Sequence, residues 1–156
     1  MEYGGEMKTK AILCDIDMTT VDSSKAMDAC VLISNCEERW NCFYGHLDLQ
    51  ETMQWCVDIL KNSGLPVVFV TGRCVTYADK TIPILDTFGI DYKLIMREEG
   101  DFRPDYVVKN EVLEKLLKTY DFVFAIDDRE SNCQVFFEHG IPTLQVYYPK
   151  ELKIGG

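Results

Sequence analysis

Two pairs of aspartates follow two short apolar segments: Asp15 and Asp17 near the N-terminus, Asp127 and Asp128 in the last third of the chain. Each segment is typical of a buried strand, because it is short and rich in β-branched or aromatic residues. The strand ends of a parallel sheet meet at one edge, where ligands bind. Four carboxylates there would need a cation. Hard oxygen ligands suit Mg²⁺, so we predict a Mg²⁺ site formed by these four residues.

The first pair could also carry covalent chemistry. A carboxylate can attack phosphorus and form an aspartyl-phosphate, so Asp15 is a candidate nucleophile. Asp17 points to the same side of an extended chain and could protonate the leaving oxygen and then deprotonate water. A lone Asp-x-Asp is more often an N-cap or a turn. The second pair, Asp127 and Asp128, is what favours the catalytic interpretation.

Two further segments could bind a phosphate. Thr71, Gly72 and Arg73 follow another apolar segment, and a Thr hydroxyl, a Gly backbone and a helix start could hold phosphate oxygens. A plain strand-to-helix turn with an N-cap is the alternative. Lys109 lies four residues after Asp105, a spacing that could pair the two on a helix and fix the amine.

Apolar segments and helical patterns alternate along the chain. The expected strands are 11–16, 66–70, 92–96, 122–126 and 142–146. The expected helices are a segment from Leu49 that Gly64 closes, then 77–88, 106–120 and 129–139. We therefore predict an α/β fold: a Rossmann-like parallel sheet of about five strands with helices on both faces. Residues 10–148 would form one domain between a lead-in (1–9) and a tail (149–156), with a short insert or lid at 19–46 and no large cap domain.

Composition and net charge limit which kinds of molecule the protein is expected to bind. The 156 residues suit one domain, and no segment is long and apolar enough to span a membrane. A net charge of −10 argues against extended binding to duplex nucleic acid, although local cations could hold one phosphorylated end. None of the seven cysteines falls in a CxxC pair, and we interpret them as reduced residues of a cytoplasmic protein.

In this order, the motifs Asp15-Ile-Asp17-Met-Thr19, Thr71-Gly-Arg73, Lys109 and Asp127-Asp128 resemble those of the haloacid dehalogenase superfamily. The resemblance covers Lys10 to about Tyr147. It implies that Asp15 is the nucleophile, that Asp17 is the general acid and base, and that Thr71 and Lys109 bind the phosphoryl group. It also implies that Mg²⁺ is held by Asp15, the backbone carbonyl of Asp17 and Asp127, with Asp128 close by. The family usually has Gly where Met18 stands.

The second half is similar to the 3′-phosphatase domain of phage polynucleotide kinase. The segments that carry this similarity run from Arg97 to Lys109 and from Ala125 to Arg129. By this resemblance Asp105 and Arg73 are functional, and Arg39 is a possible equivalent of an arginine in the insert. The chain has no GxxxxGK[ST] loop, so we expect a phosphatase module without the kinase half.

Three functions remain open at this point. The first is a phosphomonoesterase acting on a nucleotide or a nucleic-acid 3′-phosphate, and the second is a phosphatase for small metabolites. The third is a phospho-acceptor signalling domain, which also clusters Asp, Thr and Lys in a small α/β fold but in a different order. Arg97 and Arg103 could bind an anionic substrate or form salt bridges at the rim. Trp40, Phe43 and Tyr44 could stack on a base or form a small core of the insert.

Overall fold

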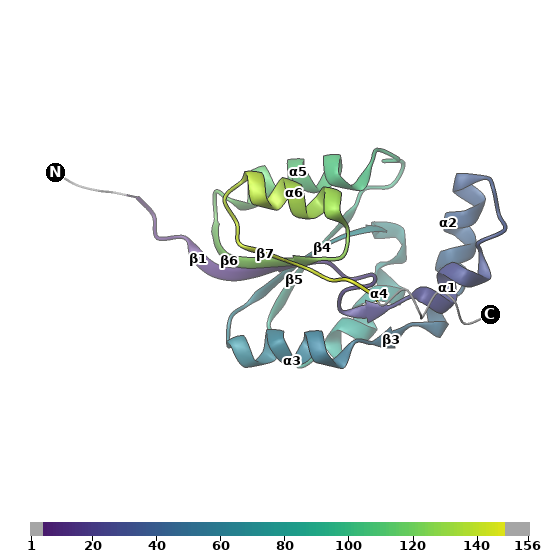
Figure 1. Cartoon of the computed structure of the whole chain (residues 1–156), viewed down its shortest axis with the longest axis horizontal. Helices are drawn as coiled ribbons and strands as arrows, with labels where there is room; N and C mark the ends of the chain where they lie inside the picture. Colours follow the sequence, from purple (N-terminus) through teal and green to yellow (C-terminus); the bar gives the residue numbers. More distant parts are fainter. Residues whose placement is uncertain (1–4, 149–156) are drawn as a thin grey trace.

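A parallel five-stranded sheet forms the centre of the molecule in a computed structural model, which describes residues 5–148 (Figure 1). Its strands are β1 (Thr9–Cys14), β4 (Val67–Cys74), β5 (Tyr92–Arg97), β6 (Tyr120–Asp127) and β7 (Thr143–Gln145). Every neighbouring pair is parallel. The predicted strands and the predicted fold class are confirmed.

The strand order is β5-β4-β1-β6-β7, which is 3-2-1-4-5 when these five strands are numbered along the chain. The order reverses between β1 and β6, and ligands of open α/β sheets bind outside the strand ends at such a reversal. β1 ends one residue before Asp15, and β6 ends on Asp127. Receiver domains have the order 2-1-3-4-5. The sheet therefore argues against the signalling-domain alternative.

Helices cover both faces of the sheet (Figure 1). α3 (Gln54–Ser63) and α4 (Ala78–Asp86) lie on one face, and α5 (Asp105–Leu116) and α6 (Glu130–Glu138) lie on the other. Because side chains alternate along a strand, Ile12 and Cys14 of β1 pack with α3 and α4, whereas Ala11 and Leu13 pack with α5 and α6. All four predicted helices form, and Gly64 ends α3 in a left-handed conformation (φ 67°) as expected.

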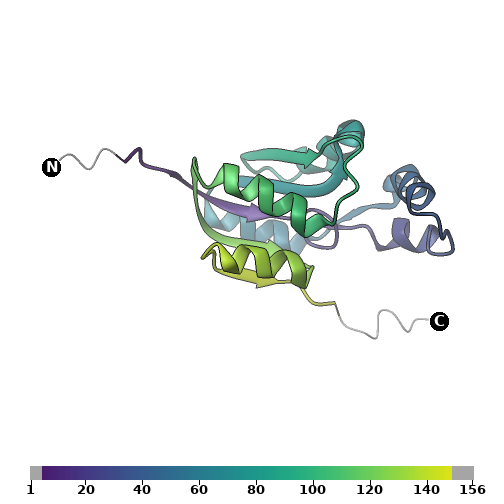
Figure 2. The ribbon, with the colours of Figure 1, turned by 90° about the horizontal axis from the view of Figure 1, so that it is seen from above.

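The insert at 19–46 contains elements that the sequence pattern did not reveal. β2 (Val21–Asp22) pairs antiparallel with β3 (Glu51–Thr52), which follows the 3-10 helix η1 (Leu47–Leu49). Between them lie α1 (Ser24–Ala29) and α2 (Cys36–Gly45), at one end of the molecule (Figure 2). The insert and η1 share a small apolar cluster of their own, which consists of Ala26, Cys30, Phe43, Tyr44 and Leu47.

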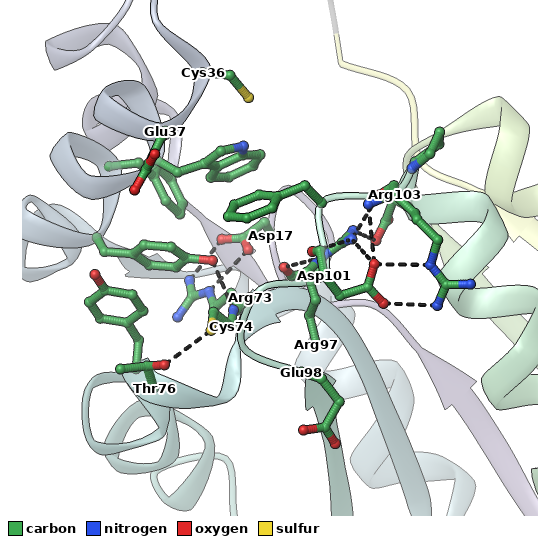
Figure 3. Close-up of a pocket in the computed structure, with 18 of the residues that line it drawn as sticks. Asp17, Cys36, Glu37, Arg73, Cys74, Thr76, Arg97, Glu98, Asp101 and Arg103 are labelled. Atoms are coloured by element: carbon green, nitrogen blue, oxygen red, sulfur yellow. Dashed lines mark hydrogen bonds and ion pairs between the residues drawn. The ribbon is translucent and has the colours of Figure 1, made fainter.

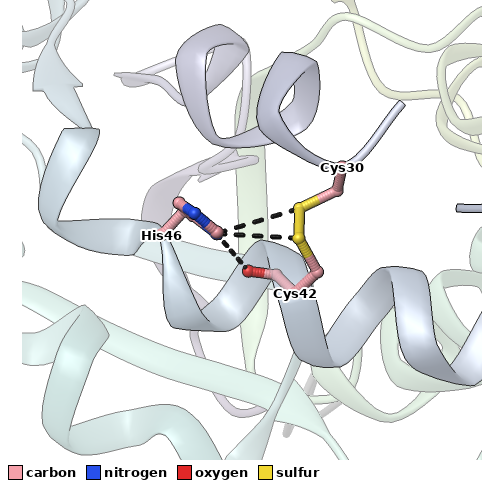
Figure 4. A group of neighbouring side chains, drawn as sticks. All are labelled: Cys30, Cys42 and His46. Carbon is pink, nitrogen blue, oxygen red and sulfur yellow. Dashed lines mark hydrogen bonds between the residues drawn. A yellow bond between two sulfur atoms is a disulfide. The ribbon is translucent and has the colours of Figure 1, made fainter. Parts of the chain in front are cut away.

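A disulfide between Cys30 and Cys42 joins the end of α1 to α2 (Figure 4). The expectation that all seven cysteines are reduced is therefore wrong for these two. They are 12 residues apart in the sequence, and only the packing of α1 against α2 brings their Cα atoms to 5.9 Å. The His46 imidazole lies beside the disulfide, and its Nδ1–H donates to the Cys42 carbonyl at 2.8 Å.

No helix within residues 5–148 is both long and apolar enough to cross a lipid bilayer. The predicted tail (149–156) and the first four residues of the predicted lead-in lie outside the described residues.

Candidate active site

A buried lysine joins Asp15, the residue after β1, to Asp127, the last residue of β6. Asp15 is fixed beside β6, since its backbone N–H donates to the carbonyl of Ile126 at 3.0 Å. The Lys109 ammonium, from α5, donates to Asp15 Oδ1 at 3.0 Å and to Asp127 Oδ2 at 2.7 Å. All three side chains are nearly inaccessible to solvent. Three groups separated by many residues in sequence thus form one buried ionic cluster.

This cluster has more negative than positive charge. Burial and the neighbouring Asp127 carboxylate raise the pKa of Asp15 well above its usual value. Burial alone would lower the pKa of Lys109, but the surrounding carboxylates, with Asp15 first, raise it overall, so Lys109 is an ammonium. Burial and Asp127 also raise the pKa of Asp128, to about 6. A divalent cation would relieve this crowding.

The carboxylates of Asp15, Asp127 and Asp128 suit such a cation. One oxygen from each lies within 4.8 Å of the others, and oxygen-only ligand sets are typical of Mg²⁺ sites. The Asp17 carboxylate does not belong to this group. Asp17 was also predicted as a ligand of the cation, and in this arrangement its backbone carbonyl, not its carboxylate, would be the ligand.

The Asp17 carboxylate is held by Arg73 instead (Figure 3). Arg73 Nε donates to Asp17 Oδ2 at 3.0 Å and Nη2 donates to Oδ1 at 2.7 Å, a bidentate contact that fixes both oxygens. The guanidinium is almost fully buried, and its other N–H groups donate to Thr81 and Gln50. Neither Thr81 nor Gln50 belongs to a motif, so their contacts with Arg73 were not predictable from the sequence.

The turn after β4 differs from the predicted one. β4 continues through Thr71 and Gly72 to Cys74, and the 3-10 helix η2 (Val75–Tyr77) precedes α4. The start of α4 therefore does not directly follow Thr71. The Thr71 hydroxyl is buried and accepts the backbone N–H of Arg73 at 3.1 Å.

Asp105 leaves no space for a side chain at Gly72. A Cβ at this position would lie 2.8 Å from Asp105 Oδ1, nearer than carbon and oxygen can approach. Asp105 in turn contacts Lys109 at 3.4 Å, so the predicted pair four residues apart does form. Asn132 Nδ2 donates to Asp105 Oδ2 and to both oxygens of Asp127. Asn132 is a third residue of the site that no sequence motif indicated, although it lies only five positions after Asp127.

Burial alone would raise the pKa of Asp105, but Lys109, Asn132 and nearby arginines lower it overall, so Asp105 is a carboxylate. Arg97 Nη2 donates to Asp105 Oδ1 at 3.2 Å. Asp105 therefore links the Lys109 cluster to the loop that follows β5.

Arg39 does not reach the site. It lies on α2 with its side chain exposed, and its Nε donates to the Ile33 carbonyl at 2.6 Å. It does not line the cavity described below. Met18, where the family usually has Gly, has a left-handed backbone (φ 59°) that favours glycine.

A cavity of about 410 Å³ lies above the aspartates, between the insert and the strand ends. Figure 3 shows Asp17 and Arg73 between Glu37 of the insert on one side and Asp101 and Arg103 on the other. Asp15, Asp17 and Asp128 all line this cavity. The arrangement can therefore hold a cation and present a carboxylate to one bound molecule.

Comparison with known proteins identifies the family. The model of the polynucleotide kinase PNKP phosphatase domain matches residues 9–150. The chain belongs to this family. It is a phosphatase of the haloacid dehalogenase type, as the motifs around Asp15, Thr71, Lys109 and Asp127 indicated. No curated protein matches the chain in sequence.

Solved structures agree with this assignment. A chain of a Pnkp1/Rnl/Hen1 complex is 26% identical, with a TM-score of 0.69 over 92% of this chain and 47% of its own length. The chain thus spans about half of that relative. The class C acid phosphatase of Bacillus anthracis, 19% identical, has a TM-score of 0.65 over 93% of this chain and 69% of its own, which shows the shared fold.

Proposed function

We propose that the protein hydrolyses phosphomonoesters through an aspartyl-phosphate on Asp15, with Mg²⁺ as cofactor, and that its substrate is a nucleotide or a nucleic-acid 3′-phosphate. The observation that carries the reaction is the buried cluster of Asp15, Lys109 and Asp127, of which Asp15 lines the cavity. Its excess of negative charge suits a divalent cation, which phosphatases of this superfamily generally use.

In the first step an Asp15 oxygen attacks phosphorus and the bond from phosphorus to the leaving oxygen breaks. Asp17 gives that oxygen a proton. In the second step a water attacks the aspartyl-phosphate, and Asp17 takes the proton of that water, so that inorganic phosphate and free Asp15 are released. Arg73 keeps the Asp17 carboxylate aimed in both steps.

The cation would be held by Asp15, Asp127 and Asp128, and it would offset the charge of the nucleophile and the phosphate together. Lys109 supplies a fixed positive charge at Asp15 and, in this proposal, steadies the transferring phosphoryl group with Thr71 and the Gly72 backbone. Both roles explain why an ammonium is buried here among carboxylates.

Family membership supports the choice of substrate. The family is named for polynucleotide kinase, and one of the two similar Pnkp1 complexes is described as an RNA repair complex. This chain covers less than half of those Pnkp1 chains, so the activity of the whole relative is not transferred. The insert at 19–46 forms one side of the cavity and would act as its specificity element. The cytoplasmic location stays a prediction.

Phosphate release tests the proposal. We would compare a 3′-phosphorylated oligonucleotide, 3′- and 5′-mononucleotides and a panel of sugar phosphates, each with and without Mg²⁺. We expect Mg²⁺-dependent release from the 3′-phosphorylated substrates and none from the Asp15→Asn variant. Release from sugar phosphates only would replace the nucleotide substrate with a small metabolite. Wild-type turnover by Asp15→Asn would overturn the nucleophile assignment.

A further inference from the structure

The cavity has an aromatic side that the proposed chemistry does not use. Phe43 and Tyr44 of α2 line it and are almost fully buried, so they belong to the core of the insert. Tyr44 also stacks on Tyr77 at 3.8 Å between ring centroids, and its hydroxyl accepts the backbone N–H of Cys74. These contacts fasten the insert to the end of β4 and make one wall of the cavity rigid.

Two other aromatic side chains of the cavity remain open to solvent. Trp40 is 39% exposed and Phe102 is 74% exposed, although both line the cavity. Trp40 comes from α2, where its ring is held against Phe43 and Tyr44, and Phe102 comes from the loop between β5 and α5. Large apolar side chains exposed at a concave site favour binding of a flat, partly apolar group.

The charges around the cavity do not favour a chain of phosphates. Three of its four arginines are already paired: Arg73 with Asp17, Arg97 with Asp105, and Arg103 with Asp101 and Glu111. The fourth, Arg129, is exposed and forms no ion pair within residues 5–148, so it leaves one cation for a phosphate. Carboxylates at the rim add further negative charge, namely Glu37, Glu98 and Glu99. Proteins that follow a nucleic-acid backbone instead need cations free to contact successive phosphates.

We propose that Trp40 and Phe102 stack on the base of the nucleotide that carries the scissile phosphate, so that the enzyme recognises one terminal nucleotide by its base and not by neighbouring phosphates. This inference rests on the proposed function. A volume of about 410 Å³ is within the range of roughly 300–1,000 Å³ of sites that bury one small ligand. Because every base has a π face, the preference among the four bases is weak.

The test compares two oligonucleotides that end in a 3′-phosphate and differ only in whether the terminal nucleotide has a base or is abasic. Alanine substitution of a stacking residue weakens binding by roughly tenfold per base. We therefore expect Trp40→Ala and Phe102→Ala each to lower kcat/KM on the base-bearing substrate roughly tenfold, mainly through KM. Their kcat/KM on the abasic substrate should equal that of the wild type.

The chain offers matched controls. Trp55 is 47% exposed and Phe137 is 70% exposed, and neither lines the cavity. Trp55→Ala and Phe137→Ala should leave both substrates unaffected. Phe102 lies in an exposed loop, so Phe102→Ala tests the inference even where Trp40→Ala disturbs the insert.

Equal kcat/KM of the wild type on the two oligonucleotides would overturn the inference, and so would equal losses on both substrates in the Phe102→Ala variant. Either result leaves the proposed function standing, because both substrates are still hydrolysed. If the wild type hydrolyses neither oligonucleotide and no mononucleotide, the proposed function itself fails.

Discussion

Arg73 is the residue on which the proposed role of Asp17 depends most directly. A carboxylate that must first give and then take a proton has to keep its orientation while its charge changes, and the bidentate guanidinium contact provides that. A lysine would keep the positive charge and lose the planar pair of donors. The geometry of the contact can therefore be tested separately from its charge.

We expect Arg73→Lys to lower kcat by roughly a hundredfold, the lower limit of what a positioned acid–base group contributes, while KM changes little. Steady-state kinetics with saturating Mg²⁺ would measure this. Arg103→Lys is the control, because Arg103 also makes bidentate contacts with carboxylates but is half exposed at the rim. Equal kcat values for Arg73→Lys and the wild type would show that Asp17 needs no such support.

The charged residues of the site lie in motifs with a fixed spacing and could be predicted from the sequence. The residues that orient those charged side chains could not. Asp15, Asp127 and Lys109 could be predicted to lie together, because aspartates at strand ends and a lysine four residues after an aspartate have recognisable spacing, and the structure brings them into contact. Asn132 and Gln50 were missed because only the packing of separate elements makes them partners of Asp127 and Arg73. The resemblance suggests Arg39 as a possible equivalent of an arginine in the insert, but in the structure its side chain contacts the Ile33 carbonyl and does not line the cavity.

At the scale of elements, the approach of α5 to β4 leaves no room for a side chain at Gly72. Asp105 begins α5, and its carboxylate is held by Arg97, Lys109 and Asn132, so it cannot easily move away from an added Cβ. We expect Gly72→Ala to lower the free energy of unfolding by about 1–3 kcal/mol, the usual cost of overpacking. Urea unfolding would measure it.

Gly45→Ala is the matched control for this substitution. Gly45 ends α2, and a Cβ there would meet no atom within 4 Å. Alanine should therefore be neutral or stabilise the helix, by up to about 1 kcal/mol. Equal free energies of unfolding for Gly72→Ala and Gly45→Ala would mean that Asp105 moves freely.

The disulfide between Cys30 and Cys42 also connects two elements, α1 and α2. A loop of this length restricts the unfolded chain by an amount equivalent to about 3 kcal/mol. We expect the double variant Cys30→Ser/Cys42→Ser to show faster amide hydrogen exchange in α1 and α2, with unchanged exchange in the strands of the sheet. Cys36→Ser is the control, since Cys36 is an exposed free cysteine of α2. Unchanged exchange in both helices would show that their apolar cluster alone holds them.

The elements around the sheet could be predicted from the sequence, whereas those of the insert could not. The five strands and four helices around the sheet have clear periodic patterns, because each buries one face or lies wholly in the core. The insert has a two-residue strand, a six-residue helix, α1, and a ten-residue helix, α2, in which only Phe43 and Tyr44 are buried. A small cluster with a disulfide holds it together. Such segments lack a periodic apolar pattern of sufficient length, so their structure was not predictable from local sequence.

At the scale of the whole molecule, the acidic composition and the paired arginines lead to the same expectation for salt. The chain has a net charge of −10, and three of the four arginines of the cavity already contact carboxylates, which leaves only Arg129 for a phosphate. Only the scissile phosphate would then exchange counterions for protein contacts. Each phosphate contact on a single strand contributes a slope of about −0.7 to the logarithm of affinity against the logarithm of salt concentration.

A rise from about 50 to 200 mM salt should therefore lower kcat/KM on a 3′-phosphorylated oligonucleotide only about threefold, and by the same factor on a 3′-mononucleotide. A protein with six phosphate contacts on a single strand would lose about three-hundredfold. Glu98→Lys offers a matched change, because it places a positive charge at the rim of the cavity. It should steepen the slope for the oligonucleotide and leave that for the mononucleotide almost unchanged. A steep slope in the wild-type protein would show that phosphates beyond the terminal nucleotide do bind, despite the charge of the molecule.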